Sequence, residues 1–278
     1  GVGEWTRALG WQRPDAASED YGGERGPNIY GDKLGFSLGD GQDFPAPTAI
    51  VDQVAGDESA IDNVYTTITE AINAVPSSAW PTIEVRPGTY PEKAYINKRV
   101  ALFGQVGAVV PRIAGPGDDH PVYFSNGSEG AVVNGFVIQQ DANAPSPQSG
   151  IRGNMTSSSV EIRIANCLVR GNSAQYGGGL RLYRGTIIVE HCTFLENSAS
   201  AQGDAVYINN DGSGTLLIRN SILWNPAGAS GQEIAGQTYH VDVEASLVRN
   251  GELGGVGGAP FLAPAAFLTI HSPARNVS

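Results

Sequence analysis

The second half of the chain repeats itself about every 25 residues, and this period restricts the fold more than any other feature. Residues 161–174 align with residues 186–199, which places Cys167 on Cys192, and each cysteine is followed five residues later by Asn-Ser-Ala. Each copy holds short stretches that alternate apolar and polar residues, separated by Gly, Asn, Ser and Pro. This pattern is typical of strands and not of helices.

Repeated short strands with no helix between them predict an all-β fold, a single-stranded right-handed parallel β-helix. In such a solenoid each coil pairs its backbone with the coils above and below it. Further copies place Gly135, Ser221 and Ser246 in the cysteine column. Gly and Pro together make up 54 of the 278 residues, which argues against bundles of long helices.

The same alignment predicts a polar column at one corner of the coil. Asn134, Asn166 and Asn220 share this column, and His191 occupies the same position in its own copy. Stacked asparagines can hydrogen-bond along the axis and can adopt the left-handed conformation that a tight corner needs. We therefore interpret the column, with His191, as structural.

The two cysteines are predicted to be stacked neighbours. Adjacent strands place Cys167 and Cys192 roughly 5 Å apart. Two alternatives stay open, namely small buried thiols or a disulfide between coils, since that spacing is compatible with a bridge.

Residues 66–76 predict the one clear helix of the chain. Its apolar side chains follow helical spacing at Ile68, Ala71, Ile72 and Val75. Thr67 and Glu70 fit a capping box, and Pro76 ends the helix. A short amphipathic helix before a β-helix is expected to act as a lid over the open end of the core. We predict an irregular segment at 1–47 and the β-helix domain, with its terminal cap, at 48–278.

Three stretches before the repeats resemble a known family. Residues 50–59, 65–74 and 83–92 resemble the opening of pectin-lyase-like parallel β-helix proteins of bacterial surfaces. The Asn-Ser-Ala repeats and the ending at 259–274 resemble the β-helix region of secreted proteins with an anchor-Q-type C-terminus. The turn at 88–92, Gly-Thr-Tyr-Pro-Glu, is similar to one in pectin methylesterases.

The resemblance implies a protein exported to the bacterial cell surface or the medium. Its partners would be a polysaccharide or a cell-surface protein, and end-to-end or lateral self-association is a further expectation. The formal net charge of −11 argues against nucleic-acid binding. No apolar run is long enough to span a membrane.

The repeat also predicts one candidate site. An offset of 29 residues stacks Arg152 on Arg181 and Asp204 on Glu233, and a period of two places these columns on one face. We predict an outward polar cluster with two tyrosines nearby that could contact sugars. Its members are Arg152, Arg181, Asp204 and Glu233, with Tyr176 and Tyr183. The alternative is a set of solvated charges that pair across coils.

Two functions fit these residues. The first is a non-catalytic module that binds glycan or protein or takes part in surface assembly. The second is a polysaccharide lyase acting on acidic, uronic polymers, with Arg181 or Arg152 as the base and Asp204 and Glu233 holding a cation or acting as acid. We expect no cofactor; the alternative, Ca²⁺, would fall on the oxygen-rich turns at 115–119 and 209–213, which lack the spacing of an EF-hand loop.

Overall fold

The fold is described from a computed structural model of the chain. It describes residues 47–54, 63–77, 80–105, 109–116, 119–141, 146, 148–209, 214–226, 228–236 and 241–249, together with the backbone of 253–254 and 268–271. The predicted irregular segment at 1–47 lies almost entirely outside these residues and stays a prediction.

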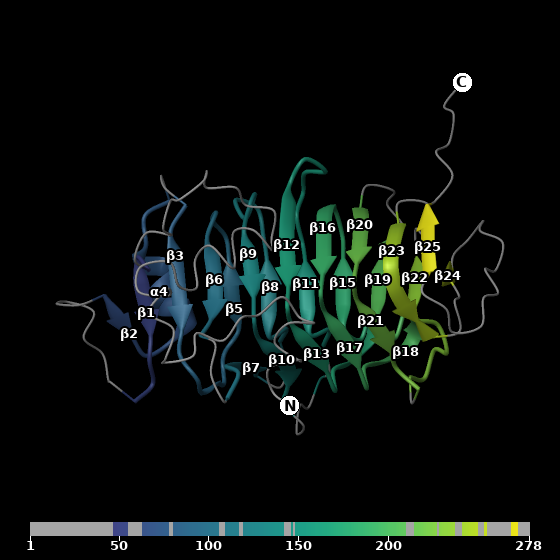
Figure 1. Ribbon diagram of the computed structural model, residues 1–278, viewed down its shortest axis with the longest axis horizontal. Helices are drawn as coiled ribbons and strands as arrows, with labels where there is room; N and C mark the ends of the chain where they lie inside the picture. The colour runs from purple at the N-terminus through teal and green to yellow at the C-terminus, as the bar shows by residue number, and fades with distance from the viewer. Residues whose placement is uncertain are drawn as a thin grey trace, which may run out of the picture. The chain divides into compact units, whose positions relative to one another are not determined.

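The right-handed parallel β-helix predicted from the repeat is the fold of this chain. Strands far apart in the sequence pair in parallel along successive coils, and Figure 1 shows them side by side. The first face consists of β2 (Val64–Tyr65), β1 (Ala49–Val51), β3 (Thr82–Val85), β6 (Ala101–Gly104), β9 (Val132–Asn134), β12 (Glu161–Ala165), β16 (Gly185–Glu190), β20 (Gly214–Arg219) and β23 (Val241–Val248), in this spatial order.

Two further faces complete each coil. The second consists of β4 (Thr89–Tyr90), β7 (Arg112–Gly115), β10 (Val137–Gln140), β13 (Leu168–Arg170), β17 (Thr193–Leu195) and β21 (Ile222–Trp224), and it joins the first face through the long β23. The third consists of β5 (Ala94–Ile96), β8 (Val122–Phe124), β11 (Ile151–Gly153), β15 (Leu180–Leu182), β19 (Val206–Ile208), β22 (Ile234–Gly236) and β24 (Leu253–Gly254). A short pair, β14 (Ser173–Tyr176) and β18 (Ser198–Gln202), lies at a corner, and β25 (Leu268–His271) pairs antiparallel with β23.

The register confirms the repeat in its best-conserved copies. Glu161 pairs with Thr186 and Thr186 pairs with Thr215, as aligned. The inward side chains of each strand then stack on those of its neighbours, so that a continuous apolar core of Ile, Val, Leu and Phe runs through the coils. Because every coil shares this core with the next one, burial and backbone pairing support each other.

The predicted polar corner is present, but in its first copy the corner position is shifted by one residue. Asn166, His191 and Asn220 have φ values of 51°, 53° and 48°, the left-handed conformation expected of a tight corner. Asn134 is not in this column, since it pairs with Ala165. Gly135, with φ of 84°, takes the corner position instead of the predicted cysteine column, and Phe136 precedes the Val137–Leu168 pair. Glycine is at home in this conformation because it has no Cβ.

Cys167 and Cys192 occupy neighbouring positions in a buried column, as predicted. The pair that follows them, Leu168 with Thr193, fixes this register. Both are free thiols. Ser221 continues the column, because its hydroxyl accepts a hydrogen bond from the Cys192 backbone N–H at 3.1 Å.

The predicted helix is α4 (Ile68–Ala74), which packs against β1, β2, β3 and β5 at the N-terminal end of the coils (Figure 1). The Thr67 hydroxyl accepts the hydrogen bond from the Glu70 backbone N–H, which is half of the predicted capping box. The Glu70 carboxylate accepts a hydrogen bond from the Thr66 hydroxyl, and the Glu92 carboxylate accepts the N–H groups of Ile68 and Thr69 at 2.7 and 2.9 Å. Ile68, Ala71 and Ile72 are buried and close this end of the core.

Candidate functional site

One outward row on the third face combines tyrosines and arginines. Tyr95 pairs with Tyr123, Tyr123 with Arg152, Arg152 with Arg181, and Arg181 with Tyr207. We call these five residues the Tyr–Arg row. Since neighbouring strands lie about 4.8 Å apart, the row extends over roughly 19 Å along the coils.

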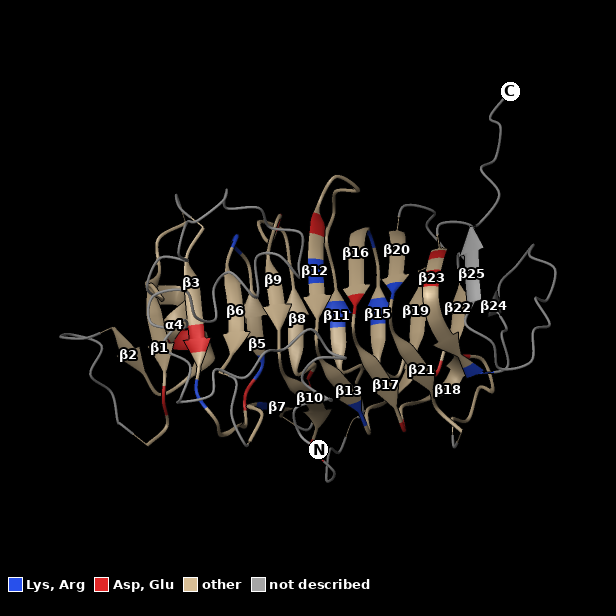
Figure 2. Cartoon of the chain, in the orientation of Figure 1, with Lys and Arg blue, Asp and Glu red and all other residues tan. Residues whose placement is uncertain are grey.

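The two arginines form the centre of the row. The predicted stacking of Arg152 on Arg181 is confirmed by their register pairing. Figure 2 shows their strands, β11 and β15, with blue bands side by side. The flanking strands β8 and β19 have the sequences Val-Tyr-Phe and Val-Tyr-Ile and carry no acidic residue.

Neither arginine has an ion-pair partner within the part of the chain that the structure describes. Burial, and next the positive charge of Arg181, lower the pKa of Arg152 from its ordinary value. The Nε of Arg181 is buried and has no hydrogen-bond partner. Two like charges kept together without a counterion favour binding of an anion between them.

Aromatic rings hold Arg181 in place. Its guanidinium lies 5.3 Å from the centroid of the Tyr176 ring and 5.9 Å from that of Tyr207. The two rings contact each other with centroids 4.8 Å apart. Tyr176 therefore lies beside Arg181, as predicted, and covers Tyr207, which is only 5% exposed. A stacked guanidinium loses little side-chain freedom when it binds a ligand.

At the other end of the row, Tyr95 and Tyr123 stack with ring centroids 5.5 Å apart. Lys93 lies over both rings, 5.4 and 4.8 Å from their centroids, and its Nζ pairs with Asp119 at 2.6 Å. This end therefore presents rings and hydroxyls with a lysine whose charge is already neutralised.

His120 lies next to the row with its ring centroid 5.9 Å from that of Tyr123. Its Nδ1 donates a hydrogen bond to the Ser149 carbonyl at 2.8 Å, so Nε2 carries the lone pair of the neutral ring. Burial lowers the pKa of His120 to about 4, and the charge of Arg152 contributes in the same direction. The imidazole is thus neutral at ordinary pH.

Tyr183 lies close to Arg152, whose pKa it affects electrostatically, and its ring also contacts the Arg184 guanidinium at 5.4 Å. Both predicted tyrosines are therefore near the arginine pair. The alignment missed Tyr95, Tyr123 and Tyr207. Tyr95 and Tyr123 were accessible from the sequence, because 28 residues separate them and 29 separate Tyr123 from Arg152.

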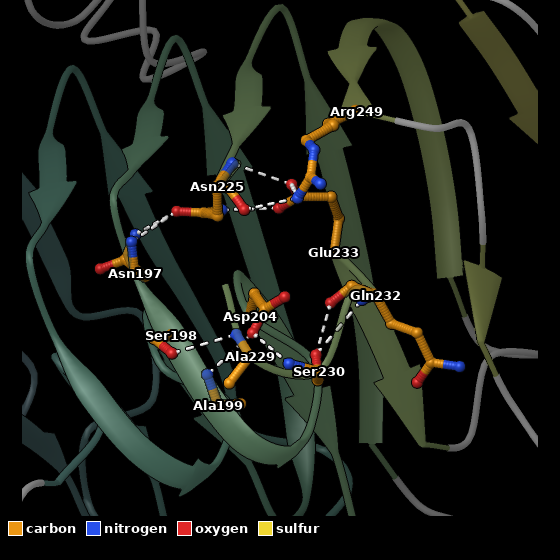
Figure 3. Close-up of polar contacts among 10 residues, drawn as sticks. All are labelled: Asn197, Ser198, Ala199, Asp204, Asn225, Ala229, Ser230, Gln232, Glu233 and Arg249. Carbon is orange, nitrogen blue, oxygen red and sulfur yellow. Dashed lines mark hydrogen bonds and ion pairs between the residues drawn. The ribbon is translucent and has the colours of Figure 1, made fainter. Parts of the chain in front are cut away.

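The predicted outward position of Asp204 and Glu233 is wrong. Their side chains are 0% and 2% exposed, and Figure 3 shows them in a network of hydrogen bonds at a corner of the coil. The predicted stacking of Asp204 on Glu233 is wrong too, because Val206 pairs with Ile234 and the offset there is 28 residues. For Asp204 the reason for its burial is a register shift between β14 and β18: Ala174 pairs with Ala199, but Tyr176 pairs with Gln202. One extra residue in a strand turns every later side chain to the opposite face.

Glu233 ends a column of buried asparagines that we call the asparagine ladder: Asn172, Asn197, Asn225 and Glu233. Each Oδ1 of Asn197 and Asn225 accepts hydrogen bonds from the backbone N–H and the side-chain amide of the preceding asparagine. Glu233 accepts both donors of Asn225 at 2.8 and 2.6 Å and lies 3.8 Å from Arg249. Burial raises the pKa of Glu233.

Asp204 is also occupied within the fold. Its Oδ1 accepts hydrogen bonds from the backbone N–H groups of Ala199 at 2.8 Å and Ser230 at 3.2 Å, as Figure 3 shows. Gly228 lies so close to the carboxylate that a Cβ there would clash with it. Asp204 therefore connects β18 with the loop that contains Ser230.

Among the described residues, no three His, Cys, Asp or Glu side chains converge on a common point that could hold a metal ion. Both turns considered for Ca²⁺ extend into residues outside the described part of the chain. In the described residues, no helix is long and apolar enough to cross a membrane.

Comparison with known proteins finds similarity in structure alone. No protein-family model and no curated protein matches the sequence. A pectin methylesterase solved in complex with a hexasaccharide aligns with 64% of this chain at 17% identity and a TM-score of 0.44, and the match spans 55% of that enzyme. The pectin methylesterase of Aspergillus niger aligns with 78% of this chain at 16% identity and a TM-score of 0.45, spanning 70% of that enzyme. At these identities the likeness concerns the fold.

Proposed function

We propose that this protein is a carbohydrate-binding β-helix and that the Tyr–Arg row is its binding surface. The proposal depends on one observation, the alignment of tyrosines and unpaired arginines on successive strands of one face. Tyrosine rings pack against the C–H faces of sugars while their hydroxyls exchange hydrogen bonds. A linear glycan advances per sugar by a distance similar to the spacing of the strands, so each exposed rung can contact one unit, with Tyr176 presenting its ring where it covers Tyr207.

The ionisable groups near the row favour binding without catalysis. A general base is most effective when its pKa lies near the working pH. The pKa of His120 is about 4, Asp119 is paired with Lys93, and Asp204 and Glu233 are engaged inside the fold. The lyase function would have to use Arg152 or Arg181 as the base, without the predicted acidic partners beside them.

We also propose that the protein works outside the cell. The low lysine content, the acidic net charge and the family resemblance support this location. Backbone pairing between coils makes such a solenoid resistant to proteolysis, which is useful there.

Affinity electrophoresis tests the proposed function. The protein is run through gels that contain neutral and acidic polysaccharides, beside Tyr95→Ala and Trp224→Ala. Trp224 is a matched control, since it is 38% exposed on β21 of another face and Tyr95 is 37% exposed. We expect at least one polysaccharide to retard the wild type and the Trp224 variant but not the Tyr95 variant. No retardation in any gel, or equal retardation of all three proteins, would contradict the proposal.

The same polysaccharides test the lyase alternative. The protein is incubated with each of them, with and without Ca²⁺, and the absorbance of unsaturated uronate ends is followed. We expect no product. A product that disappears in Arg152→Gln would show that the row is an active site.

A further inference from the structure

The distribution of charge along the Tyr–Arg row restricts the kind of glycan that it can bind; this inference rests on the proposed function. Several described cations of this acidic protein have carboxylate partners, such as Arg86 with Asp52 and Arg163 with Glu190. Arg152 and Arg181 do not, although the chain carries 28 acidic residues against 17 basic ones. Their positive charge is therefore concentrated on two adjacent rungs.

The rungs on either side of the pair carry no unpaired cation. On one side, Lys93 is neutralised by Asp119 and covers the rings of Tyr95 and Tyr123. On the other side, Tyr207 pairs with Ala235, so the next rung on β22 ends in a small apolar residue. An acidic group outside the central rungs would find no counterion and would face the field of a molecule with a net charge of −11.

We propose that the row recognises a glycan in which an isolated acidic sugar lies between uncharged sugars. The carboxylate is bound between the guanidinium groups of Arg152 and Arg181, whose planar forks match its two oxygens. The neighbouring neutral sugars contact Tyr95 and Tyr123 on one side and Tyr176 on the other. The glycan chain runs across the strands, along the axis of the coils.

The arrangement disfavours two other ligand classes. A neutral glycan would leave two neighbouring guanidinium groups without a counterion, so it would gain only the ring contacts. A uniformly charged polyuronate would gain the arginine contact, but it would place further carboxylates over rungs that hold no free positive charge.

Hexagalacturonates that differ only in charge provide the test. Three forms are titrated calorimetrically into the full chain: one fully methyl-esterified, one with a single free internal carboxylate, and one with six free carboxylates. The single-carboxylate form is expected to bind at least tenfold more tightly than the neutral ester and no more weakly than the fully acidic form at low salt. Arg152→Gln should reduce the first ratio to about one.

Arg170→Gln is the matched control. Arg170 lies on β13, outside the Tyr–Arg row, and forms an exposed ion pair with Glu196, so the substitution removes the same charge from another place. It should change none of the three affinities. Tightest binding of the fully acidic form, or equal binding of the ester and the single acid, would overturn this inference and leave glycan binding by the row intact. Failure of all three to bind, while another polysaccharide is retarded through Tyr95, would overturn it as well. Failure of every polysaccharide to bind would overturn the proposed function itself.

Discussion

The asparagine ladder and the Tyr–Arg row are built by the same stacking of coils and differ in how their polar groups are satisfied. Inside the fold, each asparagine side chain of the ladder finds its partners one coil away, and Glu233 accepts the last donors. Outside, the guanidinium groups of Arg152 and Arg181 lie on adjacent coils and neutralise nothing in the described chain. A repeated polar residue is therefore structural where neighbouring coils satisfy its hydrogen bonds and charge, and available for a ligand where they do not.

Breaking the ladder gives the largest expected loss of stability. In Asn197→Leu, the buried N–H and amide of Asn172 lose their acceptor and Asn225 loses a donor. Buried donors and acceptors left without partners each cost about 1–3 kcal/mol, so we expect the free energy of unfolding to fall by roughly 3 kcal/mol or more. Denaturant unfolding of this variant beside Arg170→Gln measures the effect. A loss below about 1 kcal/mol would remove the distinction between the two columns.

Acid should weaken the part of the molecule next to the row through His120. Its folded pKa of about 4 lies below the ordinary value of 6.5, so the fold favours the neutral ring. This contribution is fully present above pH 6.5, is lost as the pH falls toward 4, and amounts to about 3 kcal/mol at most.

Unfolding at a series of pH values measures the His120 effect, with His120→Gln as the comparison. The amide of Gln can still donate a hydrogen bond, but it does not titrate, so the variant should lose this part of the pH dependence. Identical slopes for wild type and variant between pH 6.5 and 4 would refute the assignment.

The ladder should respond to pH in the opposite sense. Burial raises the pKa of Glu233 above its ordinary value, so folding favours the protonated carboxyl relative to the unfolded chain. Its contribution to stability is present below the unfolded pKa and is lost as the pH rises through the raised folded value. The carboxyl stretch of Glu233 in a difference infrared spectrum of wild type against Glu233→Gln reports its titration directly. A midpoint at or below the value of a free glutamate would contradict this sign.

The smallest effect is expected in the cysteine column. In Cys192→Ser, the new hydroxyl can donate to the Glu190 carbonyl as the thiol does, and Ser221 makes the equivalent bond to Arg219 one coil further. We expect less than about 1 kcal/mol of destabilisation and unchanged glycan binding. Glycan binding and unfolding are measured on the same variant. A large loss of binding with intact folding would show that the thiol contributes to function.

Much of the fold could be predicted from the sequence because each coil of a solenoid repeats the same pattern of apolar and polar residues. The pairs of β12, β16 and β20 follow directly from the aligned copies, and α4 follows from its helical spacing. The site could be predicted only in part. Arg152 and Arg181 follow from their spacing, whereas the single inserted residue in β18 has no signature in the pattern.

That insertion also explains why the alignment missed Tyr207 and why it placed Asp204 on the outside. It moved Tyr207 into the row opposite Arg181 and turned Asp204 into the fold. The corner of Asn166 does carry the predicted hydrogen bond between asparagines, from its side-chain amide to the Asn134 Oδ1 at 2.8 Å. The longer ladder, however, runs through Asn172 and Asn197, which were already aligned in the repeat. Which of two asparagine columns lies inside depends on the path of the turn, and that path is not encoded in the period.

A structure of the protein with a bound oligosaccharide shows directly whether the Tyr–Arg row is the binding surface. Crystals soaked with the hexagalacturonate that carries one free carboxylate should show the sugar chain along β8, β11 and β15. Its carboxylate should lie within hydrogen-bond distance of Arg152 and Arg181. A sugar bound on another face of the coils, with the two guanidinium groups uncontacted, would contradict the account.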